Sequence, residues 1–279
     1  MHIESSKFFK ELEQAILSDN LVLPSLPDVA LKIRDAVESE NSSAEQIADA
    51  ISQDSSLSVR LLKVVNSPLY RTRNPINDLQ MAVARLGVRM VRDLIMSLAM
   101  KQMFQATSEG LDEKFRDAWN TSVNVASICQ MMATAVAGVK KEEALLAGLI
   151  HNIGALPILQ FAENNTELFN DAEALNSRIW DIQGKVGALI LQNWNFSSNL
   201  IEVVSECHNF EYTGSDDSPL LYLVQVTLLQ GGFVPDNKMP EDWSQVPAFS
   251  RLGMETEVDA INITENQQMI EDSKQSLLF

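Results

Sequence analysis

The chain has 279 residues, 46% of them hydrophobic, which is enough for a globular core and within the range of two domains. It has no uninterrupted run of about 18 apolar residues, so we expect no membrane span. Its first residues lack a basic region followed by an apolar core, so we expect no secretion signal. Its two cysteines, Cys129 and Cys207, lie far apart in the sequence, which is typical of reduced thiols in a cytoplasmic protein.

The net charge of −17 is unevenly distributed. Residues 1–107 carry 12 Lys and Arg against 13 Asp and Glu, whereas residues 108–279 carry 9 against 25. This break indicates two regions of different surface character. The acidic second half would repel phosphates, so nucleic acid is disfavoured as a partner, and the simplest role of these charges is to keep the protein soluble.

Apolar residues recur at helical spacing through residues 1–107, without strand-like alternation. Leu23–Pro27 should form an extended connector, because a residue that precedes proline is disfavoured in the α region. Ser43 and Gln46 form a candidate capping box, and Asp54 or Ser55 should cap the following helix. We expect helices over residues 5–18, 28–37, 43–51, 55–65, 78–86 and 88–104.

The second half also has helical periodicity. An apolar stripe runs from Leu111 to Val136 and predicts the longest helix, and an apolar helix from about Lys140 follows it. Residues 235–249 have the composition of a loop, and residues 258–278 that of a pair of short helices or an acidic tail. Further helices are expected over residues 164–174, 174–194, 198–208 and 220–230.

Four motifs mark the first half: Leu23-Pro24-Ser25-Leu26-Pro27, Ile51-Ser52-Gln53-Asp54, Val65-Asn66-Ser67-Pro68-Leu69-Tyr70 and Arg85-Leu86-Gly87-Val88. Their order and spacing resemble those of the HDOD family, the HD-related output domain of bacterial signalling proteins, over about residues 20–235. The resemblance implies an all-α fold, with an N-terminal helical bundle packed against a C-terminal domain related to the HD phosphohydrolases. The expected domains are residues 1–107 and 108–235, with an acidic, helical extension over residues 236–279.

One helix of the second half ends in a polar pair, His151 and Asn152. Ala144, Ala147, Gly148 and His151 share a face of this helix, and three of these residues are small enough to let another helix approach closely. The segment resembles the His-Asp signature of HD metal phosphohydrolases, with Asn152 in place of the aspartate. This exchange replaces a charged metal ligand with a neutral amide.

By the same resemblance, most of the other metal-ligand positions of that superfamily also lack an ionisable ligand here. Leu228 falls where an aspartate is expected, and Thr121 where the first histidine is expected. The positions that correspond to the metal site are Thr121, His151, Asn152, Gln183, Cys207, His208 and Leu228. We therefore predict a degenerate site that holds no catalytic metal.

Two interpretations of the remaining histidines stay open. His151, His208 and Cys207 could form a soft, zinc-like ligand set if their helices converge. The simpler interpretation makes His151 a core histidine that binds a backbone carbonyl and a side chain such as Asn152, with Cys207 as a small buried hydrophobe.

Residues 60–92 contain a cluster of basic side chains, and Asp78 is the only acidic residue in that range. It either docks on the acidic second half of the same chain or receives an acidic partner or an anionic nucleotide signal. We call it the basic face, and it comprises Arg60, Lys63, Arg71, Arg73, Arg85, Arg89 and Arg92.

The sequence thus predicts a non-catalytic signalling module without a cofactor, which contacts other signalling proteins in the bacterial cytoplasm. The alternative is an atypical metal-dependent phosphohydrolase that acts on a phosphoester or nucleotide. A third interpretation is a module that senses a nucleotide without turnover. The ligand atoms available at Thr121, Asn152, Gln183 and Leu228 distinguish the first two interpretations.

Overall fold

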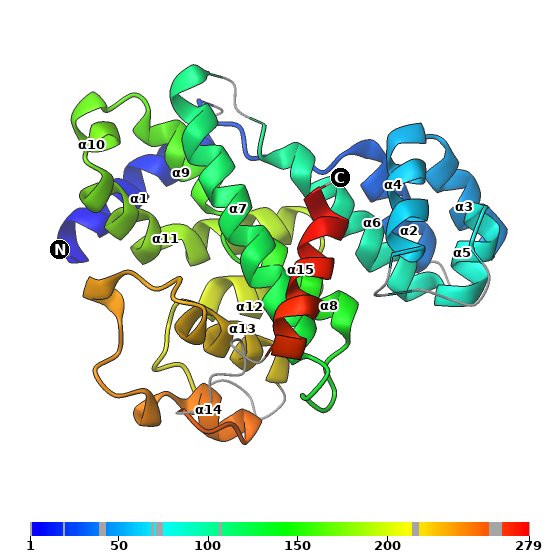
Figure 1. Cartoon of the computed structure of the whole chain (residues 1–279). Coiled ribbons are helices and arrows are strands. Elements are labelled where there is room, and N and C mark those ends of the chain that lie inside the picture. The colour runs from blue at the N-terminus through cyan, green and yellow to red at the C-terminus, as the bar shows by residue number, and fades with distance from the viewer. Residues whose placement is uncertain are drawn as a thin grey trace.

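The computed structural model describes residues 2–18, 20–38, 43–67, 70, 75–105, 108–213, 218–256 and 264–278. Within these ranges the chain is built from helices and contains no strand (Figure 1), which confirms the predicted all-α class. The helices of the first half are α1 (His2–Leu17), α2 (Asp28–Glu38), α3 (Ala44–Ser52), α4 (Ser55–Val65), α5 (Leu79–Leu86) and α6 (Val88–Met103).

The second half surrounds α7 (Glu109–Met132), which crosses the middle of the molecule in Figure 1. The region expected to be a loop near residue 240 contains the 3-10 helices η1 (Asp236–Lys238) and η2 (Trp243–Gln245). The other helices are α8 (Lys141–Ile150), α9 (Ala155–Ala162), α10 (Thr166–Asn170), α11 (Ala172–Asn193), α12 (Ser198–Glu206), α13 (Pro219–Gln230), α14 (Pro247–Leu252) and α15 (Thr264–Leu278).

Local signals in the sequence account for several helix ends. Ser43 and Gln46 form the predicted capping box of α3, and the Asp54 carboxylate accepts a hydrogen bond from the backbone N–H of Leu57 at the start of α4. Gly87 separates α5 from α6 at φ 83° and ψ 154°, a conformation that L-residues with a side chain rarely adopt. The chain therefore turns at Gly87, and α6 begins in a new direction.

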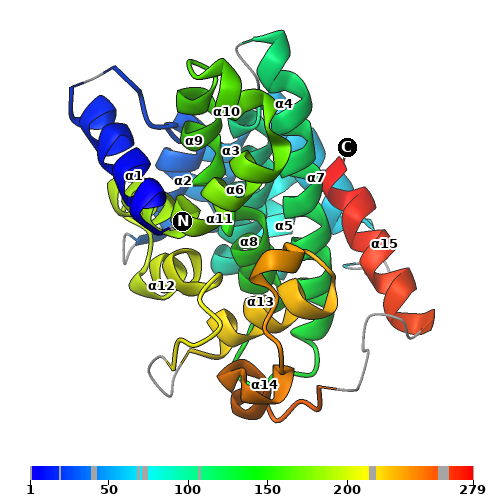
Figure 2. The same cartoon turned by 90° about the vertical axis from the view of Figure 1, so that its left-hand side faces the viewer.

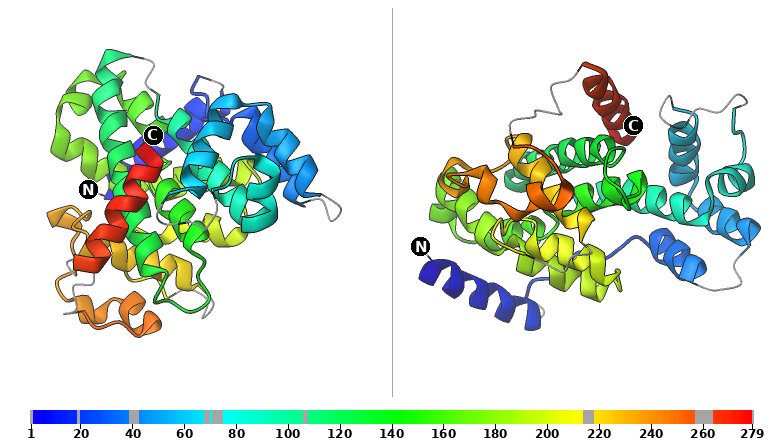
Figure 3. Two further views of the ribbon diagram at one scale, coloured as in Figure 1. Left: turned by 45° about the vertical axis from the view of Figure 1, so that its right-hand side comes forward. Right: turned by 90° about the horizontal axis from the view of Figure 1, so that it is seen from below.

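The two terminal helices both pack on the second half. The Phe8 ring of α1 meets Phe161 of α9 edge-on at 5.3 Å, and α1 lies against α11. Helix α15 lies along α7, on the side of the second half opposite to α1 (Figures 2 and 3). The division at residues 107 and 235 stays a proposal, and α1, which it assigns to the first domain, packs on helices of the second.

Hydrogen bonds join the two halves around Trp194, at the C-terminal end of α11. Its indole N–H donates to the Pro24 carbonyl (3.0 Å), and its own carbonyl accepts a bond from the Arg34 guanidinium (2.5 Å). The Gln130 amide of α7 connects two further segments, because it donates to the Tyr70 hydroxyl (2.9 Å) and accepts from Ser273 of α15 (2.6 Å). These bonds hold the extended connector at the end of α11, and they hold Tyr70 and α15 on α7.

Among the described residues, one helical stretch, Lys141–Ala162, has the length and composition to cross a membrane. However, 89% of its apolar window is buried inside the protein. Such burial is expected of the central helix of a folded core, and α8 and α9 fill that position here.

The small-residue face of α8 is in close contact with α7, as the sequence predicted. A Cβ atom added at Gly148 would lie 2.4 Å from the Cα atom of Ala126 on α7. Backbone atoms cannot yield as a flexible side chain can, so only glycine allows the two helices to lie this close together.

We expect Gly148→Ala to lower the free energy of unfolding by about 1–3 kcal/mol, because α8 would have to move away from α7. Gly110→Ala on α7 is the matched control, since its added Cβ would lie 3.6 Å from its nearest neighbours and helix propensity favours alanine. Denaturant unfolding of both variants tests this, and equal stabilities would contradict the close-packing argument.

Candidate functional site

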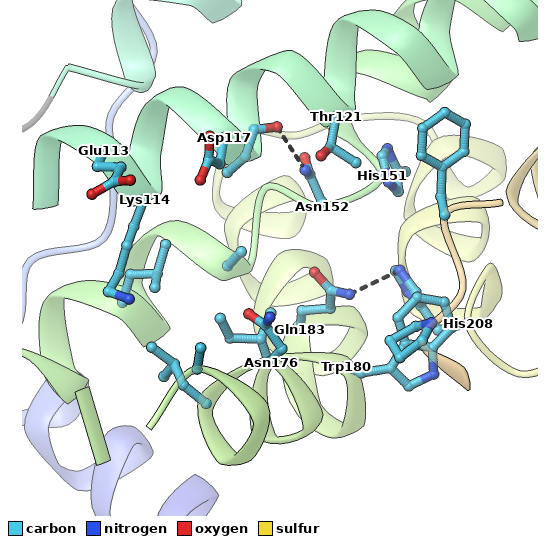
Figure 4. Close-up of a pocket in the computed structure, with 18 of the residues that line it drawn as sticks. Glu113, Lys114, Asp117, Thr121, His151, Asn152, Asn176, Trp180, Gln183 and His208 are labelled. Atoms are coloured by element: carbon cyan, nitrogen blue, oxygen red, sulfur yellow. Dashed lines mark hydrogen bonds between the residues drawn. The ribbon is translucent and has the colours of Figure 1, made fainter. Parts of the chain in front are cut away.

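A cleft of about 550 Å³ lies between α7 and α11, and its end is closed by the turn after α8 (Figure 4). Helix α7 provides one wall and α11 provides the opposite wall. Six of the predicted degenerate-site residues line it, and the seventh, Cys207, lies beside His208 with its sulfur 3.2 Å from Nδ1 of that histidine. The six are Thr121, His151, Asn152, Gln183, His208 and Leu228.

Asn152 uses both ends of its amide to bind α7. Its Nδ2 donates to the carbonyl of Ala118 (3.0 Å), and its Oδ1 accepts from the hydroxyl of Ser122 (2.7 Å). Asn152 is 6% exposed, so these bonds satisfy a buried polar group. The expected bond between Asn152 and His151 is replaced by these two bonds, because the turn directs the amide toward α7.

His151 is held by its own helix. Its Nδ1 lies 2.6 Å from the carbonyl of Gly148, and because a carbonyl can only accept, Nδ1 carries the proton. Burial lowers the pKa of His151 to about 4, although the bond to Gly148 opposes part of this shift. At neutral pH the imidazole is therefore uncharged, and its Nε2 is a hydrogen-bond acceptor.

His208 is also neutral. Burial lowers its pKa, and the nearby His151 lowers it further. The amide Nε2 of Gln183 lies 2.9 Å from Nε2 of His208, so the amide donates and the ring nitrogen accepts. The rings of His151 and His208 are stacked, with their centroids 5.9 Å apart.

These residues do not fit the metal that the HD resemblance implies. Among the described residues, no group of three or more His, Cys, Asp or Glu side chains is arranged to hold a metal ion. Leu228 has no donor atom, the amide of Asn152 is committed to α7, and burial raises the pKa of the Cys207 thiol, which keeps it protonated. A hard divalent cation requires anionic oxygen ligands, and this set of residues contains none.

Sequence reasoning missed four residues that also line the cleft. Glu113 and Asp117 are exposed side chains on α7, Lys114 lies 4.7 Å from the centre of the Phe169 ring, and Trp180 projects from α11. Glu113, Asp117 and Thr121 recur every four residues on α7. That spacing was the available signal, but polar residues at helical spacing also occur on the solvent face of any amphipathic helix.

The structure divides the basic face. Arg60 is half-buried, and its guanidinium donates to the Leu98 carbonyl (3.0 Å) of α6. Arg92 is paired with Asp93 at 2.7 Å, which keeps both partners within the first half. Arg71 and Arg73 lie outside the described residues.

The rest of the basic face is exposed. Lys63 lies on α4, Arg85 lies in the last turn of α5, and Arg89 lies in the first turn of α6 after the break at Gly87. Neither Arg85 nor Arg89 forms an ion pair with any other residue that the structure describes. Their charges are therefore available at the surface.

Comparisons with known proteins agree with the fold. The sequence model of the HDOD domain matches residues 23–210. An uncharacterized protein of Treponema pallidum (strain Nichols) is 26% identical over 254 residues, which cover 85% of this chain and 47% of that relative, so the chain spans about half of its length.

Two crystal structures resemble the whole chain. A Shewanella amazonensis SB2B protein, provisionally named a metal-dependent phosphohydrolase, is 30% identical with a TM-score of 0.82, covering 99% of this chain and 98% of that one. A Marinobacter aquaeolei VT8 protein, provisionally named a signal transduction protein, is 19% identical with a TM-score of 0.69, covering 100% of this chain and 66% of that one. The second likeness concerns the fold alone.

Asn152→Asp should destabilise the protein by about 1–3 kcal/mol at neutral pH, because a buried carboxylate cannot donate to Ala118 and would face its carbonyl oxygen. The loss should be smaller in acid, where the carboxyl is protonated. Asn164→Asp makes the same chemical change at an exposed position and is the control. Thermal and denaturant unfolding test this, and equal effects of the two changes would rule out the role given to Asn152.

His151 should make stability fall in mild acid. Its pKa is lowered from 6.5 to about 4 in the folded state, so the unfolded chain binds the proton more tightly. The contribution is complete above pH 6.5 and declines as the pH falls to about 4, by at most about 3 kcal/mol. His151→Gln, which cannot titrate, should flatten the measured pH dependence in this window, and an unchanged slope would contradict the assignment.

Proposed function

This chain belongs to the HDOD family, and we propose that it is a non-catalytic regulatory module of bacterial signal transduction that acts through protein–protein contact. The observation that carries the proposal is that the Asn152 side chain forms hydrogen bonds to α7 at both ends of its amide. The residue at the central metal-ligand position of the HD pattern is a neutral amide whose two ends already bind Ala118 and Ser122.

The electrostatics of the cleft support the same proposal. A hydrolytic metal lowers the pKa of a bound water, and anionic ligands normally hold such a hard cation in place. His151 and His208 are neutral at physiological pH, and Leu228 offers only methyl groups. The inner residues of the cleft therefore do not provide the charge of a hydrolytic centre.

The exposed part of the basic face is the proposed contact surface for an acidic partner. Arg85 and Arg89 lie in a half whose charges nearly cancel, whereas the rest of the chain is strongly acidic. A local cation pair of this kind attracts an acidic protein and orients it during association. We place this interaction in the cytoplasm, with another signalling protein as the partner.

The alternative function, an atypical metal-dependent phosphohydrolase, is favoured by two observations. Two acceptor imidazoles, His151 and His208, lie next to each other in the cleft, and the Shewanella relative carries a phosphohydrolase name. Elemental analysis of the purified chain, together with assays of phosphodiester hydrolysis in Mn²⁺ and Zn²⁺, separates the two functions. A stoichiometric metal with metal-dependent turnover would establish the alternative.

Reversal of two charges tests the contact surface. The double variant Arg85→Glu and Arg89→Glu should unfold within about 0.5 kcal/mol of the parent, because both side chains are exposed. It should lose a partner that the parent retains in cross-linked pull-downs from native cells, and the interaction of the parent should weaken with salt.

Lys10→Glu on α1 is the matched control, since it reverses an exposed charge elsewhere on the molecule. Retention of the same partner by the double variant would refute the role of the basic face. Unfolding of the double variant would instead mean that these arginines stabilise the fold.

A further inference from the structure

We propose that the cleft between α7 and α11 binds a small, flat nitrogen heterocycle that is neutral or cationic and donates hydrogen bonds. This inference rests on the proposed regulatory function and adds the chemical class of the ligand that the site would sense. It follows from the acceptor atoms, the aromatic wall and the charges that the cleft presents.

The inner end of the cleft presents a fixed acceptor at His151. Its Nδ1 proton is donated to the Gly148 carbonyl, so Nε2 is the acceptor nitrogen of the ring. The side chain is 2% exposed and cannot easily change its orientation. A ligand that reaches this nitrogen must bring an N–H or O–H group.

Gln183 presents a second acceptor on the opposite wall. Its amide nitrogen is turned toward Nε2 of His208, as Figure 4 shows, and this leaves its Oε1 as the acceptor end of the amide. Gln183 is 5% exposed and lines the cleft beside His208. Because His208 holds the amide in one orientation, a ligand cannot obtain a donor here without breaking that bond.

Between these polar atoms, the cleft has flat and apolar walls. Trp180 lines it and meets the His208 ring edge-on at 4.5 Å, and Phe233 approaches from the segment after α13. Leu159, Leu175 and Ile179 provide aliphatic surface. The volume of about 550 Å³ is that of a small-molecule site, and such sites usually combine apolar walls with a few polar groups that fix orientation.

The entrance to the cleft carries negative charge. Glu113 and Asp117 line it from α7, and the ammonium group of Lys114 lies over the Phe169 ring. Two carboxylates and one cation, in a chain of net charge −17, disfavour a phosphate and favour a neutral or cationic molecule. This selectivity is opposite to that required for the anionic substrates of a phosphohydrolase.

The test compares two flat probes by titration calorimetry with the full chain. The first, 2-aminobenzimidazole, has several N–H donors and is neutral or cationic near pH 7, whereas 2-naphthoate is anionic and has no donor. We expect binding of 2-aminobenzimidazole at least about ten-fold tighter than that of naphthoate, and weaker at high salt. Equal binding, preference for naphthoate, or no binding of either probe would overturn the proposal.

Two variants locate the binding. Asp117→Asn should weaken 2-aminobenzimidazole several-fold, whereas Asp112→Asn, on the same helix but outside the cleft lining, should not. His151→Phe should weaken it about ten-fold through loss of the acceptor. If His151→Phe does not fold, the exposed Asp117 decides the result, and equal affinities of the Asp117 and Asp112 variants would refute the site.

The outcome is separable from that of the proposed function. If 2-aminobenzimidazole does not bind and the metal-supplemented chain also shows no hydrolysis, the ligand class is wrong and the non-catalytic function stands. If metal-dependent hydrolysis appears, the non-catalytic function fails, whatever the probes show.

Discussion

The approach of α8 to α7 at Gly148 and Ala126 determines the geometry of the cleft. Because the backbones lie so close, the turn after α8 brings the Asn152 amide within hydrogen-bond distance of the Ala118 carbonyl and the Ser122 hydroxyl. The same glycine supplies the carbonyl that fixes the proton of His151 on Nδ1. One small residue thus allows the helices to pack, and its carbonyl sets which atom of His151 can accept a hydrogen bond.

The elements of the fold were predictable because they depend on local chemistry. Helical periodicity predicted the long helix α7, the capping box predicted the start of α3, and the small residues of α8 predicted its close packing. The association of α1 with α11 was not predictable, since an amphipathic stripe indicates that a face is buried but not which helix covers it.

The site was predictable only in part, for a similar reason. The resemblance to a family indicated which positions to compare, and six of them line one cleft. It did not indicate that Asn152 binds Ala118 instead of His151, because that choice depends on the direction of a turn. Glu113 and Asp117 were not predictable as site residues, because charged residues on an exposed helix face resemble any other surface until a facing wall is known.

Several motif residues that carried the family resemblance have structural roles in this chain. The Asn66 amide donates to the carbonyls of Leu62 (2.8 Å) and Ile76 (2.7 Å) and accepts from the Ile76 N–H (2.8 Å), and so joins the end of α4 to Ile76. Gly87 allows the turn between α5 and α6, and Asp54 caps α4. These roles explain why the motifs predict the fold well and say little about a partner or ligand.

The chemistry of the cleft is consistent with its charges. A buried carboxylate is costly unless a cation compensates it, so a site without a metal is more stable with neutral groups in its interior. Asn152, Leu228 and two neutral histidines meet that requirement. Glu113 and Asp117 do not incur this burial cost because they are exposed to solvent at the entrance. The interior therefore accepts hydrogen bonds without charge, and the exposed carboxylates at the entrance determine which charged molecules can approach.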